Sequence, residues 1–148
     1  MTPLRLFKAL AVTEAVTWAA LLTGMLLKYG FKTTELGVQI AGPIHGVAFI
    51  AFCLVTIVIG IDQGWSKRRV LLGLASSIPP FFTILFERYA ESRGLLGTSW
   101  QSRADSPGRG QRAVCWLLHN RLRALAAFAG AVVALTAVAL IAGPPVGG

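Results

Sequence analysis

Four long apolar runs dominate the sequence and restrict what it can fold into. They cover residues 9–27, 36–61, 70–86 and 122–142. A helix of about 20 apolar residues spans the hydrocarbon core of a bilayer. Only 14% of the 148 residues are charged, whereas a soluble domain carries roughly 25%. The sequence therefore predicts an all-α, polytopic transmembrane helix bundle, with three core helices and a fourth C-terminal transmembrane helix.

Composition divides the chain into three parts. Residues 1–92 contain the first three apolar runs and are expected to form a three-helix transmembrane domain. Residues 93–111 are rich in Gly, Ser, Pro and Arg and lack apolar periodicity, which is typical of a linker. Residues 112–148 are expected to begin with an interfacial segment and to continue into the fourth transmembrane helix.

Prolines fall at two informative places in the apolar runs. Gly42 and Pro43 come early in the second run, and proline is tolerated in the first turn of a helix, so the regular helix is expected to start there. Pro79 and Pro80 interrupt the third run. Because they remove two backbone donors, a kink or a break is expected at this point.

The formal charge of +8 arises from 14 Lys and Arg against six Asp and Glu. The basic residues lie at the N-terminus or between the apolar runs, and they form no basic face interleaved with aromatic residues. This pattern indicates the lipid bilayer, with its anionic headgroups, as the partner and argues against nucleic acid. The expected location is a cell membrane, with several passes through it.

The distribution of basic residues also bears on orientation. With four spans, the first and third loops carry more Lys and Arg than the N-terminus and second loop together. The positive-inside rule then favours both termini outside. The compact basic cluster at residues 67–69, in the short second loop, favours the opposite orientation.

Glu14 is the acidic residue inside the first apolar run, about 9 Å along the helix from Lys8. A carboxyl group in the apolar layer should face the bundle interior, hold a proton, or pair with a donor such as the hydroxyl of Thr13 or Thr17 or a residue of the third helix. Two interpretations follow. Glu14 is either a proton or cation site or a polar contact that holds helices together.

His45 follows Pro43 by two residues, where the start of a helix would keep its ring neutral. A neutral imidazole can bind haem iron or another metal, but a second ligand at similar depth is then needed. The other histidine, His119, lies in the junction before the last run. The alternative is a hydrogen-bonded histidine near the membrane interface, and no metal or cofactor is predicted.

Glu87 and Arg88 end the third apolar run. An adjacent acid and base at a membrane boundary usually snorkel to the interface. With three core spans, Glu87 would lie near the depth of His45, and Glu14 would lie in the opposite half of the membrane.

Small residues recur at the spacing that allows close contact between membrane helices. Helix packing is their expected role, and association with a membrane protein partner or with further copies of the chain is a second possibility. The residues concerned are Gly42, Gly46, Ala126, Gly130 and Ala134.

Signatures of soluble enzymes are absent from the sequence. It contains no phosphate-binding loop, no G-x-S-x-G, no H-E-x-x-H and no CxxC. Cys53 and Cys115 are isolated thiols rather than a disulfide framework. The chain is therefore expected not to be an enzyme.

Three segments together carry a resemblance to a known family. They are EAVTWAALLTGMLLKY at residues 14–29, GPIHGVAFIAF at residues 42–52 and WSKRRVLLGLASSIPPFFTILFERY at residues 65–89. Their order and spacing resemble the YdzA-like family of small bacterial integral membrane proteins, a family of unknown function with three predicted spans. The additional C-terminal helix lies outside the resemblance.

The resemblance implies three spans in residues 1–92 but no activity. It marks as family-typical the residues Glu14, Lys28, Tyr29, His45, Gly46, Trp65, Pro80, Phe81 and Glu87.

The leading hypothesis is a non-enzymatic accessory subunit or assembly factor of a larger bacterial membrane complex. Its docking surface would be the small-residue face of the last helix. One alternative is a small oligomeric proton-coupled transporter or channel that uses Glu14 and His45. A further alternative is a haem- or quinone-binding redox membrane protein.

Overall fold

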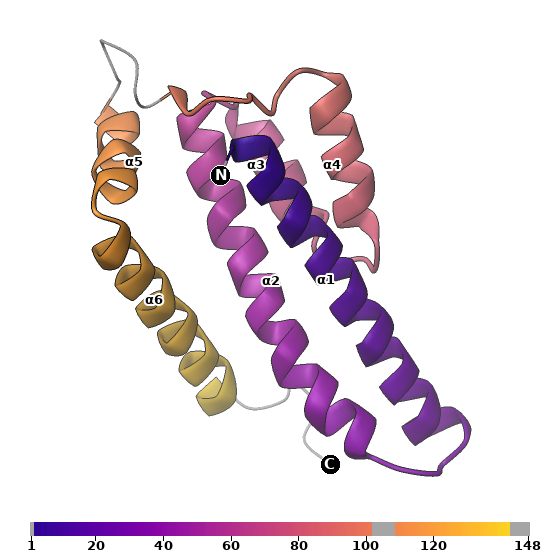
Figure 1. The fold of residues 1–148 in the computed structure, drawn as a ribbon. Helices are drawn as coiled ribbons and strands as arrows, with labels where there is room; N and C mark the ends of the chain where they lie inside the picture. Colours follow the sequence, from indigo (N-terminus) through magenta and orange to yellow (C-terminus); the bar gives the residue numbers. More distant parts are fainter. Residues whose placement is uncertain (1, 102–108, 143–148) are drawn as a thin grey trace.

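The computed structural model describes residues 2–101 and 109–142, and within these residues every regular element is helical. This confirms the predicted all-α class. In chain order the elements are α1 (Pro3–Met25), the π-helical turn η1 (Leu26–Gly30), α2 (Leu36–Asp62), α3 (Lys67–Ala75), α4 (Phe82–Ser92), α5 (Arg109–His119) and α6 (Arg121–Ala142) (Figure 1).

Two helical stretches are long and apolar enough to cross a membrane. They are Pro3–Gly30, with 28 residues, and Leu36–Asp62, with 27 residues. At about 1.5 Å per residue each is roughly 40 Å long, which exceeds the roughly 30 Å of a hydrocarbon core. They run antiparallel and pack along much of their length (Figure 1). Thr2 caps the start of helix α1, and its hydroxyl accepts a hydrogen bond from the Arg5 amide at 3.2 Å.

The third apolar run forms two short helices instead of one span. Helix α3 has nine residues and α4 has eleven, so each is roughly 14–17 Å long and too short to cross. The amides of Ser77 and Ile78 tighten the end of α3 with bonds to the carbonyls three residues earlier. The two prolines that follow have no amide to donate. Phe81 then adopts a left-handed conformation, with φ 68°, and the chain reverses direction.

Helices α3 and α4 form a hairpin whose two ends lie at the same end of the bundle (Figure 1). Trp65 Nε1, just before α3, donates to the carbonyl of Leu95, just after α4, at 2.8 Å. The Leu4 amide, in the first turn of α1, donates to the Gly97 carbonyl at 3.4 Å. The expectation of a third spanning core helix is therefore wrong in this structure, because the break at the prolines is a full reversal. We call this end, where α1 begins and α2 and α4 end, the hairpin end.

Helices α5 and α6 lie along the other side of α2 (Figure 1). Val114 of α5 is buried, and Phe128 of α6 packs against the core of the bundle. The apolar part of the last helix, Leu122–Val138, is shorter than the two candidate spans. A fourth transmembrane helix remains a prediction. Residues 102–108 of the predicted linker lie outside the described residues.

An aromatic cluster forms the core of the hairpin end. The ring of Phe7 lies 5.2 Å from that of Phe52, 5.9 Å from that of Trp65 and 6.1 Å from that of Phe86, between centroids. These rings come from α1, α2, the α2–α3 turn and α4. Their burial fixes the hairpin against the two long helices.

The closest approach of α1 and α2 is at Gly24 and Gly37, and not at the predicted glycines. A Cβ atom built on Gly24 would lie 2.6 Å from the Gly37 carbonyl carbon, whereas one on Gly42 or Gly46 would meet nothing within 4 Å. The predicted helix start was also wrong, because α2 begins at Leu36 and contains Pro43. This earlier start extends the packed part of α2 past the proline, as far as Gly37.

Candidate functional site: a buried polar cluster at the hairpin tip

Glu14 is completely buried between α1 and the hairpin. The hydroxyl group of Thr83, in the first turn of α4, lies 2.7 Å from Glu14 Oε2 and 3.3 Å from the backbone carbonyl oxygen of Ala11. Glu14 Oε1 is buried and has no hydrogen-bond partner. The sequence correctly indicated that this carboxyl faces the bundle interior, and of the expected partners it is a residue of the third apolar run, Thr83, that contacts it rather than Thr13 or Thr17.

Thr17 connects the surroundings of Glu14 to His45. Its hydroxyl lies 2.8 Å from the Glu14 carbonyl oxygen and 3.0 Å from His45 Nδ1. A hydroxyl carries one proton, so when it donates to the carbonyl it can only accept from the imidazole Nδ1–H. With Thr17 donating to the Glu14 carbonyl, a neutral His45 ring carries its proton on Nδ1; with Thr17 donating to His45, Nδ1 is the acceptor.

The turn between α3 and α4, which we call the hairpin tip, packs against the cluster. The Trp18 ring lies 4.5 Å from the His45 ring, between centroids, and Trp18 Nε1 donates to the Ser77 carbonyl at 3.4 Å. The Ser77 hydroxyl also lies 3.7 Å from Cys53 Sγ of α2. Groups from α1, α2 and both arms of the hairpin thus meet at one place.

Two expectations about His45 were wrong. It lies more than two turns inside α2, beyond the first turn in which a helix N-terminus acts on a charge. It also lies in the same cluster as Glu14, through Thr17, because the antiparallel packing of α1 and α2 places residues 17 and 45 at the same level. The two residues therefore do not belong to opposite halves of the membrane.

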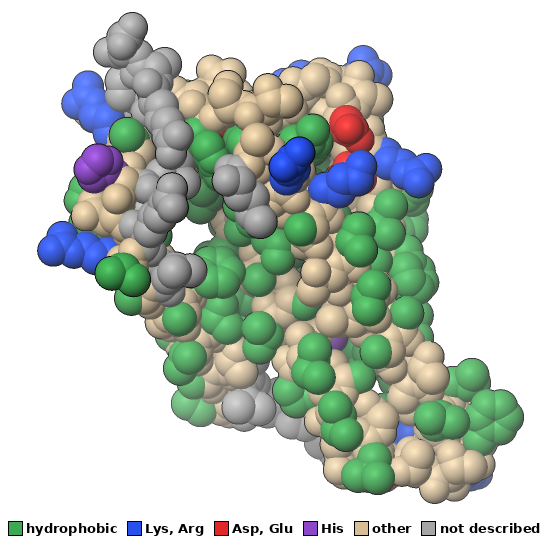
Figure 2. Space-filling view, in the orientation of Figure 1, with side chains coloured by type: hydrophobic (Ala, Val, Ile, Leu, Met, Phe, Trp, Pro, Cys, Tyr) green, Lys and Arg blue, Asp and Glu red, His purple; other side chains and the backbone are tan. Residues whose placement is uncertain are grey.

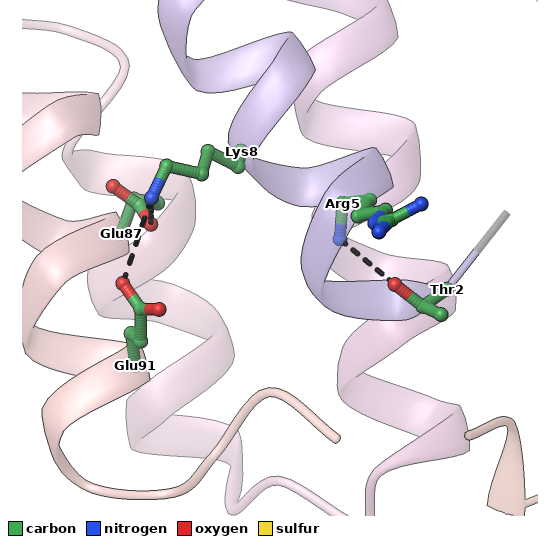
Figure 3. Close-up of polar contacts among 5 residues, drawn as sticks. All are labelled: Thr2, Arg5, Lys8, Glu87 and Glu91. Carbon is green, nitrogen blue, oxygen red and sulfur yellow. Dashed lines mark hydrogen bonds and ion pairs between the residues drawn. The ribbon is translucent and has the colours of Figure 1, made fainter. Parts of the chain in front are cut away.

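Glu87 lies at the hairpin end and not beside His45. Lys8 Nζ is 3.9 Å from Glu87 Oε1 and 3.8 Å from Glu91 Oε2, so one cation bridges two carboxylates of α4 (Figure 3). Burial raises the pKa of the Glu87 carboxyl, and the charge of Lys8 opposes this shift. Arg88 is exposed, whereas Glu87, which was expected to snorkel with it, is buried.

The remaining sequence candidates do not assemble into a site. His119 is exposed in α5, and the described contacts of His45 do not include it. Within residues 2–101 and 109–142, no three His, Cys, Asp or Glu side chains are grouped so that they could hold a metal ion. Ala126, Gly130 and Ala134 are all exposed on α6, so their face does not pack within the chain.

A groove of about 420 Å³ is lined by residues of α1 and α2. It lies beyond the polar cluster, on the side away from the hairpin end. It extends from Thr17 and Ile44 to Gly24 and Gly37, and its lining is mostly apolar. Thr17 belongs both to this groove and to the buried cluster.

Sequence reasoning did not identify Thr17 as a partner of His45. It also named neither Trp18 nor Thr83, and it did not place Ser77 in this cluster. Thr17 follows Glu14 by three residues, so the sequence indicates that both side chains lie on the same face of α1. Thr83 is 69 residues from Glu14, and the contact exists only because the hairpin reverses. No pattern in the sequence reports that reversal.

Comparison with known proteins places this structure in a family. Residues 4–92, which include α1 to α4, match the family described as "Domain of unknown function (DUF3817)". The chain belongs to this family. A relative from Streptomyces coelicolor, named "Putative membrane protein SCO5905", is 47% identical over 94 residues, which is 63% of this chain. The predicted membership of an uncharacterised membrane family is thereby confirmed, whereas the comparisons support neither the name YdzA nor the number of three spans.

The chain spans only 11% of the length of this Streptomyces relative. The matched segment is therefore a small part of a much longer protein. No solved structure matches the chain.

Proposed function

We propose that this DUF3817 protein is an integral membrane protein without catalytic activity, which serves as an accessory subunit or assembly factor of a larger membrane complex. The observation that carries the proposal is the length of the Streptomyces relative, of which the matched segment makes up 11%. A unit that is covalently joined to a larger protein in one species can bind a separate partner in another.

The proposed docking surface is the face of α6 formed by Ala126, Gly130 and Ala134. All three residues are exposed, and a Cβ atom on Gly130 would meet nothing within 4 Å. Small residues four apart allow two membrane helices to approach closely. The partner that fits this surface is an apolar transmembrane helix of another protein, and a second copy of the chain is the competing outcome.

Replacement of Gly130 by leucine should remove this partner without unfolding the chain. The leucine side chain would fill the space into which the partner helix packs, and nothing in the bundle opposes it. Chemical crosslinking in the native membrane, followed by mass spectrometry, should then lose the partner by about tenfold or more, since a clash of about 1.4 kcal/mol already gives that factor.

Ala129→Leu is the matched control, because Ala129 is exposed on the same helix but about 100° around its axis. It should keep the crosslinks. A wild-type chain that crosslinks to no protein, or only to further copies of itself, would contradict the accessory role.

We further propose that the hairpin end faces the cytoplasm of a bacterial inner membrane that α1, α2 and α6 cross. The reversal of the hairpin gathers exposed cations from three segments at this end (Figure 2). The first loop, at the opposite end, carries Lys28 and Lys32, and Lys28 is 3.4 Å from Glu35. The positive-inside rule then favours a cytoplasmic N-terminus, which reverses the orientation expected for four full spans. The gathered cations are Arg5, Lys8, Lys67, Arg68, Arg69, Arg88 and Arg93.

A specific observation favours proton-coupled transport as a second candidate function. Polar side chains continue from the hairpin end through Glu87, Thr83 and Glu14 to His45, and Thr17 then borders the groove on the other side. If this series carries protons, wild-type chain in liposomes should collapse an imposed pH gradient faster than Glu14→Gln does. The matched control is Glu91→Gln, an exposed carboxyl at the hairpin end. Equal rates for wild type and Glu14→Gln would exclude this candidate.

A further inference from the structure

Among the described residues, no cation forms an ion pair with the carboxyl group of Glu14. Its nearest basic neighbour on α1, Lys8, already bridges Glu87 and Glu91. Glu14 itself has zero exposure, and one of its two oxygens lacks any hydrogen bond. A buried carboxylate whose described partners are all neutral, with no counter-charge, is among the most costly groups that a protein interior can hold.

The geometry at Thr83 indicates how this cost is avoided. Its hydroxyl lies within hydrogen-bond distance of two acceptors, Glu14 Oε2 at 2.7 Å and the Ala11 carbonyl at 3.3 Å. A hydroxyl has a single proton and cannot donate to both in full. If Glu14 Oε2 itself carries a proton and donates it to Thr83, the hydroxyl is free to donate to Ala11, and both contacts become hydrogen bonds.

We propose that Glu14 is a proton-binding site within the membrane, in which a proton on Oε2 is donated to the hydroxyl of Thr83. Binding converts the carboxylate and a proton into the neutral acid, with no other bond formed or broken. Oε1 is then the carbonyl oxygen of that acid, and a neutral oxygen without a partner costs far less than a charged one.

The donor set favours a proton over a metal ion. Four protein oxygens are available here, two from Glu14 and one each from the Thr83 hydroxyl and the Ala11 carbonyl, whereas a hard cation such as Ca²⁺ or Mg²⁺ takes six or more ligands. A proton needs one donor oxygen and one acceptor, and the Glu14–Thr83 pair supplies both.

The site has titratable neighbours on the elements packed around it. These titratable residues are His45 and Cys53 on α2, Glu87 on α4 and Lys8 on α1. Two further neighbours are polar, Trp18 on α1 and Ser77 in the hairpin turn. None supplies a described ion pair to Glu14. Proton binding does not depend on either proposed function, because an accessory subunit could also hold such a proton.

Infrared difference spectroscopy of the full chain in lipid tests the proposal. The spectrum of wild type minus Glu14→Gln at neutral pH should contain the carbonyl band of a protonated carboxylic acid. The band should shift after incubation in D2O, because a binding site exchanges its proton. Glu87→Gln, which changes another buried carboxyl, should retain the band.

Thr83→Val should move the frequency of the band, because valine has nearly the same shape and cannot accept the proton. Glu14→Gln should fold as well as wild type, since a glutamine amide can also donate to Thr83. Carboxylate bands in place of the acid band at neutral pH would overturn the proposal. So would an acid band that never shifts in D2O, which would indicate a permanently sealed acid.

These results are separable from those on function. Loss of crosslinks to a partner would leave the infrared band unchanged, and a chain without proton flux can still show it.

Discussion

Replacement of Gly24 by alanine is expected to destabilise the folded bundle by about 3 kcal/mol or more, the upper part of the range for overpacked cores. The added methyl group would lie 2.6 Å from the Gly37 carbonyl carbon and 2.8 Å from the Val38 nitrogen. Both are backbone atoms of α2, so no side-chain rotation can relieve the contact. The two longest helices would have to separate at the end where they approach most closely.

The measurement is the midpoint of unfolding when SDS is titrated into the chain in mild-detergent micelles, followed by tryptophan fluorescence. Gly46→Ala is the matched control, since the new Cβ would meet nothing within 4 Å. Alanine is favoured over glycine in a helix by up to about 1 kcal/mol, so the control should unfold at the same or a higher SDS fraction. Equal midpoints for the two variants would show that α1 and α2 do not approach closely at Gly24.

The contrast between these glycines illustrates what the sequence can and cannot predict. Glycine spacing in an apolar run indicates that close helix packing is possible, but not which glycine pair is used. Gly42 and Gly46 have the favoured spacing, yet the contact lies at Gly24 and Gly37, which belong to different helices. The choice depends on how far α2 extends before Pro43, and the proline suggested a later start than the structure has.

Glu14 was identifiable from the sequence because a single carboxyl within an apolar run must be buried against protein. Its partner was not. Thr83 comes into contact only after the hairpin turn at Pro79 and Pro80, and a proline pair is consistent with either a kinked span or a reversal. The same ambiguity made the expected position of Glu87 wrong, because only a third full span would have placed it near the depth of His45.

Cysteine labelling should show that both ends of the α3–α4 hairpin lie on one side of the membrane. In a chain whose Cys53 and Cys115 are replaced by alanine, Lys67→Cys and Arg93→Cys precede and follow the hairpin, and Lys32→Cys lies in the first loop. A membrane-impermeant maleimide added to intact spheroplasts should label Lys32→Cys and leave the other two unlabelled. After lysis all three should react.

The expected pattern follows from contacts that a spanning α3–α4 segment could not make. Trp65 and Leu95 are joined by a 2.8 Å hydrogen bond across the two ends of the hairpin, so the labels at residues 67 and 93 must share a side. The order of protection tests the proposed orientation separately. If residues 67 and 93 both react from outside while residue 32 does not, the hairpin stands and only the cytoplasmic assignment is wrong.

If only one of residues 67 and 93 reacted from outside, the two would lie on opposite sides of the membrane and the hairpin would be wrong. The contacts of the polar cluster would then be wrong as well. In a three-span arrangement α4 would end at the side of Lys28, so Glu87 would be separated from Lys8 and Thr83 from Glu14. The buried carboxyl would then lose its described hydroxyl partner. Because a carboxyl group in the apolar layer requires such a partner, the reversal at Pro79 and Pro80 and the burial of Glu14 support one another.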